Sequence, residues 1–163
     1  MKILNSTITI FSTLLLVGCA GISASPPMEH DFKKSRTYNM DFEKVWLKAV
    51  DWFAQHDITI DKLEKPSGFI SAKYRLEADD NLLDCGDIKG NATWGKPDIM
   101  QTGSLNFTVR EISPEKTLVN INFFGEFEAL AEDIWTSSRV KSSGRCSSTG
   151  ELETRALNFI EEN

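Results

Sequence analysis

The fold class is decided by residues 105–127, which read LNFTVREISPEKTLVNINFFGEF. Apolar and polar side chains alternate on both sides of a short Ser-Pro-Glu-Lys turn at residues 113–116. Alternation with a period of two places the apolar side chains on one face of a β-strand, and the turn residues allow the chain to reverse its direction. This stretch therefore predicts an antiparallel hairpin with one buried face and one polar face.

Two helices are predicted, one before and one after this hairpin. Over residues 41–56 apolar side chains recur every three or four positions, which is the period of one helix face. Asp41 is a suitable N-cap, because its carboxylate can accept a hydrogen bond from a free N–H of the first turn. Near the C-terminus, Ser148 and Glu151 fit a capping box in front of a second apolar stripe.

Shorter strands are predicted at residues 36–40, 58–60 and 69–76. Two polar stretches, residues 77–101 and 131–147, show no apolar period and are predicted to be long loops. The order of strand, helix, several antiparallel strands and helix predicts the α+β class. We expect an antiparallel sheet of about four to five strands packed on two helices.

The composition is that of one ordinary globular domain. The chain has 163 residues, of which 40% are hydrophobic and 26% are charged. Its 18 Lys+Arg against 24 Asp+Glu give a formal net charge of −6, which argues against nucleic acid as a partner. The same values exclude a chain that is disordered throughout, a coiled coil and a protein with several membrane spans.

The first twenty residues have the order of features found in a bacterial lipoprotein signal. A basic start at Lys2 is followed by an uncharged, mostly apolar run over residues 3–17. The run ends in Leu16-Val17-Gly18-Cys19, which resembles a lipobox. The resemblance implies that residues 1–18 are removed and that Cys19 becomes the acylated N-terminus. The alternative is an ordinary secretory signal in which this cysteine is a coincidence.

The same resemblance implies a location for the protein. Ala20, where an Asp would retain a lipoprotein in the inner membrane, favours the outer membrane with the domain facing the periplasm. Residues 19–31 are rich in Ser, Gly and Pro and are predicted to be a lipidated tether. Residues 32–163 are then a single periplasmic α+β domain, held at the membrane by its lipid.

Cys85 and Cys146 remain as an even pair, because lipid is expected to occupy Cys19. In an oxidising compartment such a pair predicts a structural disulfide, which would close a loop of about 60 residues. A redox pair is an alternative, as is a metal site that His30 or His56 would complete.

The first part of the domain resembles the helix-grip domains of BamC-like lipoproteins. The resemblance lies in residues 40–46 (MDFEKVW), 58–60 (ITI) and 68–70 (GFI). It covers about 35 residues and implies a sheet that wraps the C-terminal helix and a role beside an outer-membrane assembly. The polar stretch 77–101 and the cysteine pair depart from that pattern.

The sequence contains only partial matches to catalytic, nucleotide-binding and metal-binding motifs. Residues 90–96 copy the start of a P-loop, but Pro97 stands where Ser or Thr would hold magnesium. Ser138 and Lys141 match a four-residue nucleophile motif whose partner motifs are missing. The aspartates of residues 79–98 lack the spacing of a calcium loop. We therefore expect no catalytic residues, no metal, no cofactor and no nucleotide.

Three aromatic residues are the candidates for a binding surface. Trp94 and Trp135 lie in polar stretches, and Phe124 lies on the polar side of its predicted strand. These rings could instead pack beneath the loops as a small satellite cluster. We expect a non-enzymatic lipoprotein that binds an envelope protein or component, as an accessory to an envelope assembly. The alternative is a small-ligand-binding or weakly hydrolytic domain with a pocket between the sheet and the C-terminal helix.

Overall fold

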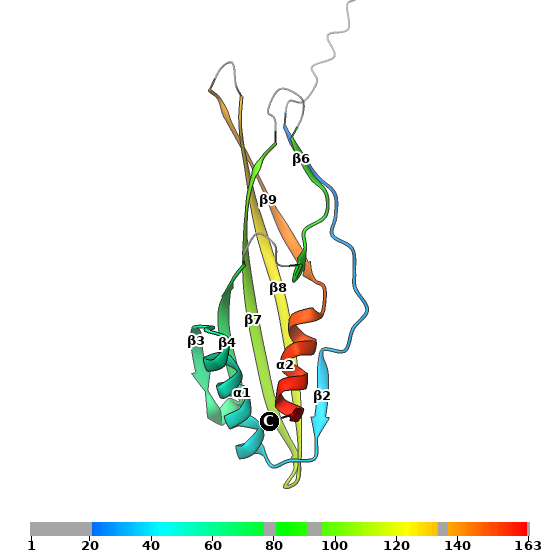
Figure 1. Ribbon diagram of the computed structural model, residues 1–163, viewed down its shortest axis with the longest axis vertical. Helices are drawn as coiled ribbons and strands as arrows, with labels where there is room; N and C mark the ends of the chain where they lie inside the picture. The colour runs from blue at the N-terminus through cyan, green and yellow to red at the C-terminus, as the bar shows by residue number, and fades with distance from the viewer. Residues whose placement is uncertain (1–20, 77–80, 91–95, 134–136, 163) are drawn as a thin grey trace, which may run out of the picture.

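The computed structural model describes residues 21–76, 81–90, 96–133 and 137–162 (Figure 1). This part of the chain contains two helices, a seven-stranded antiparallel sheet and a separate two-stranded sheet. The elements are β1 (Ile22–Ala24), β2 (Ser35–Tyr38), α1 (Phe42–Gln55), β3 (Ile60–Glu64), a 3₁₀ turn (Lys65–Ser67), β4 (Phe69–Arg75), β5 (Leu83–Asp84), β6 (Ile88–Gly90), β7 (Asp98–Ser113), β8 (Lys116–Glu132), β9 (Arg139–Ser148) and α2 (Glu151–Glu162). The predicted α+β class, with an antiparallel sheet on two helices, is confirmed.

The sheet is built around the predicted hairpin, which is longer than expected. Its strand order is β3-β4-β7-β8-β9-β5, and β2 also pairs with β8. The β7–β8 ladder runs from Asp98↔Leu130 to Ser113↔Lys116. On its other side β8 pairs with β2 near the turn and with β9 farther along. Figure 1 shows the result, an elongated molecule in which β7, β8 and β9 extend well beyond the two helices.

Both helices cover the same face of the sheet (Figure 1). The odd-numbered side chains of β8 point to this face and are buried, as are Leu105, Phe107 and Val109 of β7. They pack against apolar side chains of the helices, among them Trp52 and Phe53 of α1 and Leu157 and Ile160 of α2. The other face carries no helix and is largely polar, as expected for a one-sided antiparallel sheet.

The helix ends agree only in part with the predicted caps. Asp41 is the N-cap of α1, since its Oδ1 accepts a hydrogen bond from Lys44 N at 2.9 Å. The predicted Ser148–Glu151 capping box is wrong. The Ser148 hydroxyl donates to Glu153 instead, at 2.7 Å. It can do so because the chain turns at Gly150, which has a left-handed φ of 86°, directly before α2.

The two predicted long loops contain strands, so the sheet has more strands than the expected four to five. Residues 77–101 include β5, β6 and the beginning of β7, and residues 131–147 include the end of β8 and most of β9. The apolar period fails in β9 because its helix-side positions are small. A Cβ at Gly144 would lie 2.6 Å from the Phe127 ring, so that ring occupies the space of a β9 side chain.

The predicted disulfide between Cys85 and Cys146 is present and joins the start of the β5–β6 region to β9. It lies beside the segment predicted to be a tether. In that segment β1 pairs with β6, and Ser25 N donates to Asp87 O at 2.9 Å. Asp84 accepts hydrogen bonds from Met28 N and His30 Nε2, both at 3.2 Å. Residues 22–30 are therefore bound to the domain rather than hanging free.

Candidate functional site

The predicted site residues are placed only in part. Cys19, Trp94 and Trp135 lie outside the described residues. Phe124 lies on the helix-free face of β8, where 42% of its surface is exposed. It stands between Ser104 of β7 and Ser147 of β9 in the strand register. Phe124 is therefore an exposed aromatic ring between two small hydroxyl side chains.

A shallow crevice of about 400 Å³ adjoins Phe124. Phe32 and Lys34, which precede β2, form its other wall. Lys34 Nζ lies 5.4 Å from the centre of the Phe32 ring and 3.4 Å from Asn122 Oδ1. The crevice therefore combines three phenylalanine rings with Lys34 and Glu29, close to Cys146 of the disulfide.

A larger groove of about 1270 Å³ lies where β7 extends past the end of β4. We call it the β7 groove. It curves around β7, so that residues from both faces of the sheet line it. The helix side contributes Tyr74, Leu83 and Ile99, and the other side contributes Met100, Thr102 and Glu126. These residues belong to β4, β5, β7 and β8.

Two apolar side chains stand out along this groove. Ile99 is 37% exposed and Met100 is 50% exposed, although they are neighbours in one strand and point to opposite faces. These two exposed apolar side chains are a feature of the groove that the sequence analysis missed. Both residues fell within a stretch predicted to be loop, where the alternation that marks a strand is absent.

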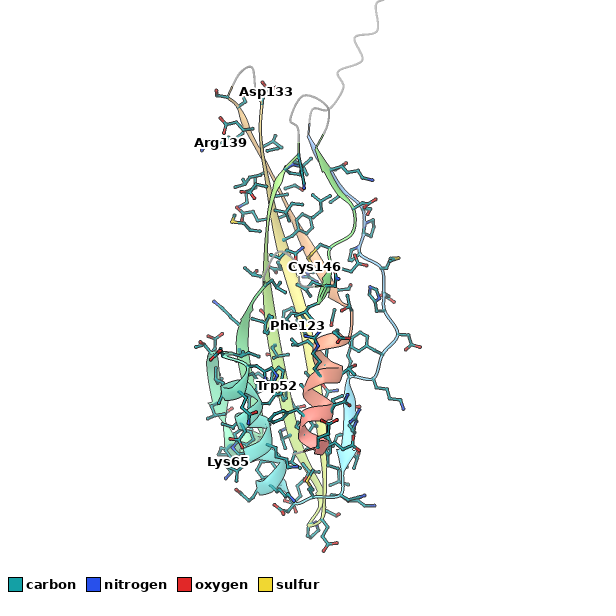
Figure 2. The ribbon with its side chains drawn as sticks, viewed as in Figure 1. Trp52, Lys65, Phe123, Asp133, Arg139 and Cys146 are labelled. Carbon is teal, nitrogen blue, oxygen red and sulfur yellow. A yellow bond between two sulfur atoms is a disulfide. The ribbon has the colours of Figure 1, made fainter. Side chains whose placement is uncertain are left out.

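The charges around the β7 groove are mixed. Asp61, Lys73 and Glu126 line it, and Asp98 begins the strand. Farther out on the helix-free face, cross-strand ion pairs join Glu128 to Lys141 and Glu132 to Arg139. Figure 2 shows Arg139 and Asp133 together at the end of the molecule farthest from the helices. These pairs cover the helix-free face of the β8–β9 end of the sheet with charge.

The interface between α2 and the sheet is filled with side chains. Leu152, Ala156, Leu157 and Ile160 are buried against the core, and Figure 2 places Trp52 and Phe123 in the same region. Polar groups here hold the helix. Tyr38 Oη donates to Leu157 O at 2.6 Å, and burial raises the pKa of this phenol. The small-ligand alternative placed its pocket at this interface, and neither of the two hollows described above is lined by α2.

Lys48 also binds the C-terminal end of α2. Its Nζ donates to Ile160 O at 3.0 Å, so a cation lies where the helix dipole is negative. Burial, with a smaller effect from Lys44, lowers the pKa of this ammonium group. Lys48 is therefore a structural lysine that connects α1 to α2.

The weak chemical motifs are not assembled into sites. Ser138 precedes β9 and Lys141 lies within it, so the two do not share the helical turn that their motif requires. Gly90 ends one strand, and another strand follows Lys96, whereas a P-loop leads into a helix. Among the described residues, no group of three or more His, Cys, Asp or Glu is arranged to hold a metal ion.

Among the described members of the acidic stretch, Asp84 binds the N-terminal segment through its carboxylate. Its Oδ1 accepts a hydrogen bond from Gly86 N at 2.8 Å, in addition to the bonds from Met28 and His30. The Gly86 hydrogen bond, with smaller contributions from His30 and Met28, holds the pKa of the Asp84 carboxyl below its usual value. Asp84 therefore fastens the N-terminal segment next to the disulfide.

None of the helices in the described part of the chain is both long and apolar enough to cross a membrane. The chain matches no known protein family. It also matches no curated protein sequence.

Proposed function

We propose that this chain is a membrane-anchored lipoprotein whose domain binds a protein or another component of the cell envelope, as an accessory to an envelope assembly, and catalyses no reaction. One observation carries the binding part of the proposal. Ile99 and Met100 are exposed beside a groove of about 1270 Å³. Apolar side chains lining a large concave surface are typical of a protein contact.

The position of the N-terminal segment supports the anchoring part. The first described strand, β1, lies at the end of the molecule where β8 turns into β9, far from the helices (Figure 1). Cys19 precedes Gly21 by two residues. A lipid on Cys19 would therefore hold this end of the domain toward the membrane and direct the helices away from it. In this orientation the β7 groove lies between the membrane and the helical end, within reach of a membrane-protein partner.

Crosslinking in intact cells tests the binding. The full chain is crosslinked and purified, and captured proteins are compared between wild type, Met100→Ala, Phe124→Ala and Trp94→Ala/Trp135→Ala. Leu47→Ala is the matched control, because Leu47 is 59% exposed on α1. We expect discrete envelope proteins that are lost in at least one of the surface variants and kept in the control. Capture no greater than with an unrelated lipoprotein would refute the binding.

Fractionation and mass measurement test the anchor independently. The mature wild-type chain should begin at Cys19, carry acyl chains and sediment with the outer membrane. Cys19→Ser should carry no acyl chain and should no longer sediment with the outer membrane, because a stable lipid anchor needs two or more acyl chains. An unmodified Cys19 in the mature protein would refute the anchor without affecting the binding test.

A further inference from the structure

The helix-free face of the sheet carries uncharged polar side chains around Phe124. The strand register places them in two neighbouring rows that cross the sheet. One row is Asn122↔Asn106↔Ser71, on β8, β7 and β4, and the other is Ser147↔Phe124↔Ser104, on β9, β8 and β7. We call these six residues the Phe124 face. Solvent reaches all of them, since the Phe124 ring is exposed and the other five side chains are half-buried.

Most of the hydrogen-bonding capacity of the Phe124 face is unused within the described part of the chain. The side chains of Ser71, Ser104, Asn106 and Ser147 make no hydrogen bond there. The exception is Asn122, whose Oδ1 accepts from a lysine at 3.4 Å. The Asn106 amide offers two N–H donors and a carbonyl acceptor, and each hydroxyl can both donate and accept. A polar ligand can therefore replace the water that these groups bind.

The charges around the Phe124 face indicate which ligand it fits. Lys73 continues the row of Phe124 on β4, and the next row pairs Glu126 with Arg145. Lys34 lies at the opposite margin. These cations are dispersed and one faces a carboxylate, whereas a phosphorylated glycan or a nucleic acid needs clustered cations. A protein contact would need a more apolar centre than one ring among polar groups. The face therefore matches an uncharged polar ligand that has a small apolar surface.

We infer that the Phe124 face binds an uncharged glycan chain of N-acetylated amino sugars. A pyranose ring presents C–H groups on its flat side, which pack on an aromatic ring, and hydroxyl groups around its rim. Its acetamido group has one donor and one acceptor, which the Asn106 amide can pair with. Asn106 lies diagonally across from Phe124, about 7–8 Å away, so one sugar unit can contact both. The inference goes beyond the proposed protein contact and rests on the proposed function only for the envelope location.

Titration with chitotetraose, a short chain of N-acetylglucosamine, tests the inference. The full lipidated chain is kept in a detergent without a sugar headgroup, and binding is measured by calorimetry and by nuclear magnetic resonance. We expect the side-chain signals of Asn106 and Phe124 to shift on binding. Maltotetraose is the matched sugar, because it has the same number of rings and no acetamido group. It should bind about fivefold more weakly or less well still, since the hydrogen bonds to the acetamido group are lost.

Variants of the two central side chains test the site itself. Phe124→Ala should raise the Kd for chitotetraose about tenfold, because the sugar loses its stacking surface. Asn106→Ala should raise it about threefold or more, through the lost amide hydrogen bonds. Leu47→Ala and Gln55→Ala are the matched controls, since they remove an exposed apolar and an exposed amide side chain from α1. If Phe124→Ala does not fold, Phe124→Leu replaces it, because leucine keeps an apolar side chain without the ring.

The outcomes separate this inference from the proposed function. The inference is overturned if chitotetraose does not bind, if maltotetraose binds equally well, or if the Phe124 variant binds as tightly as wild type. Envelope proteins captured by crosslinking, without any binding of the sugar, would keep the proposed function and overturn the inference. Sugar binding that depends on Phe124 and Asn106, with no protein captured, would support the inference and leave the protein part of the proposed function refuted.

Discussion

The side chain of Glu153 accepts a hydrogen bond from the backbone N–H of Phe123, with 3.1 Å between Oε1 and N. Phe123 lies at the point where the strand paired with this edge of β8 changes from β2 to β9. Two residues earlier, Ile121 N donates to Lys34 O, next to β2, and two residues later Gly125 is paired with Cys146 of β9. The N–H between these ladders has no strand to bind, and the fully buried Glu153 replaces the missing carbonyl.

Glu153→Leu should destabilise the domain, because it leaves the buried Phe123 N–H without an acceptor. An unsatisfied buried donor costs about 1–3 kcal/mol in the free energy of unfolding. Glu153→Gln should cost less, since its amide oxygen can still accept from Phe123. Urea unfolding measures both, and Glu151→Leu is the control, because Glu151 is exposed in the first turn of the same helix. A Glu153→Leu protein as stable as wild type would contradict this role.

The sequence predicts β8 well and β9 poorly for the same physical reason. Packing against the helices requires a large side chain at every second position of β8, and Val119, Ile121 and Phe123 provide that pattern. In β9 the corresponding positions hold Ser142 and Gly144, because side chains of β8 such as Phe127 fill the space between the strands. A strand covered by its neighbour's side chains has no apolar period of its own.

The sequence could locate candidate site residues only where it also predicted the strand that carries them. Phe124 lies on the helix-free face because the alternation of β8 places it there. The β7 groove depends on how far β4 extends along β7, and strand ends are set by tertiary contacts rather than by local pattern. The Cys85–Cys146 bridge was predictable from the cysteine count and the expected compartment, without knowledge of β5 or β9.

Removing the disulfide should lower stability and loosen the N-terminal segment. The bridge closes a loop between cysteines 61 residues apart, for which chain entropy gives roughly 4 kcal/mol as an upper expectation. Cys85→Ser/Cys146→Ser should therefore lower the free energy of unfolding by about 2–4 kcal/mol. Hydrogen exchange at Ser25 and Met28 should also accelerate, because the region they bind is attached to the main sheet through the bridge and the two-residue strand β5.

Reduced wild type is the control for the double variant, since both lack the bridge and should unfold at the same urea concentration. Equal exchange of Ser25 and Met28 in oxidised and reduced protein would show that the N-terminal segment is held without the bridge.

Acid should release the N-terminal segment before it unfolds the sheet. The hydrogen bond from Gly86, and then those from His30 and Met28, lower the pKa of Asp84 below its ordinary value of 3.8. A carboxyl whose pKa is lower in the folded protein stabilises it above the ordinary value, and this stabilisation is lost as the pH falls through the folded pKa. Asp84→Asn should therefore be less stable than wild type at neutral pH, with a difference that shrinks below about pH 3.8.

Unfolding of both proteins from neutral pH down to about pH 2.5 measures this difference. Asp87→Asn is the control, because Asp87 is exposed and its side chain pairs only with the exposed Lys89 in the described structure. A stability difference between wild type and Asp84→Asn that is the same at every pH would contradict the role of the ionised carboxylate.

Gly103→Ala should destabilise the domain, although alanine is ordinarily better than glycine inside a strand. A Cβ at position 103 would lie 2.6 Å from Cε2 of Phe123 and 3.3 Å from Cβ of Tyr74. The two rings meet edge to face over this glycine, with their centres 5.7 Å apart. Forcing a methyl group against a packed ring costs about 1–3 kcal/mol, against a gain of roughly 0.5–1 kcal/mol from the lower backbone entropy of alanine.

Thermal and urea unfolding of Gly103→Ala should show a net loss of stability, whereas the control Ser104→Ala, on the helix-free face, should change stability by less than about 0.5 kcal/mol. A Gly103→Ala protein more stable than wild type would contradict this expectation. It would mean that the Phe123 ring can move aside and that the core beside the β7 groove tolerates an added methyl group.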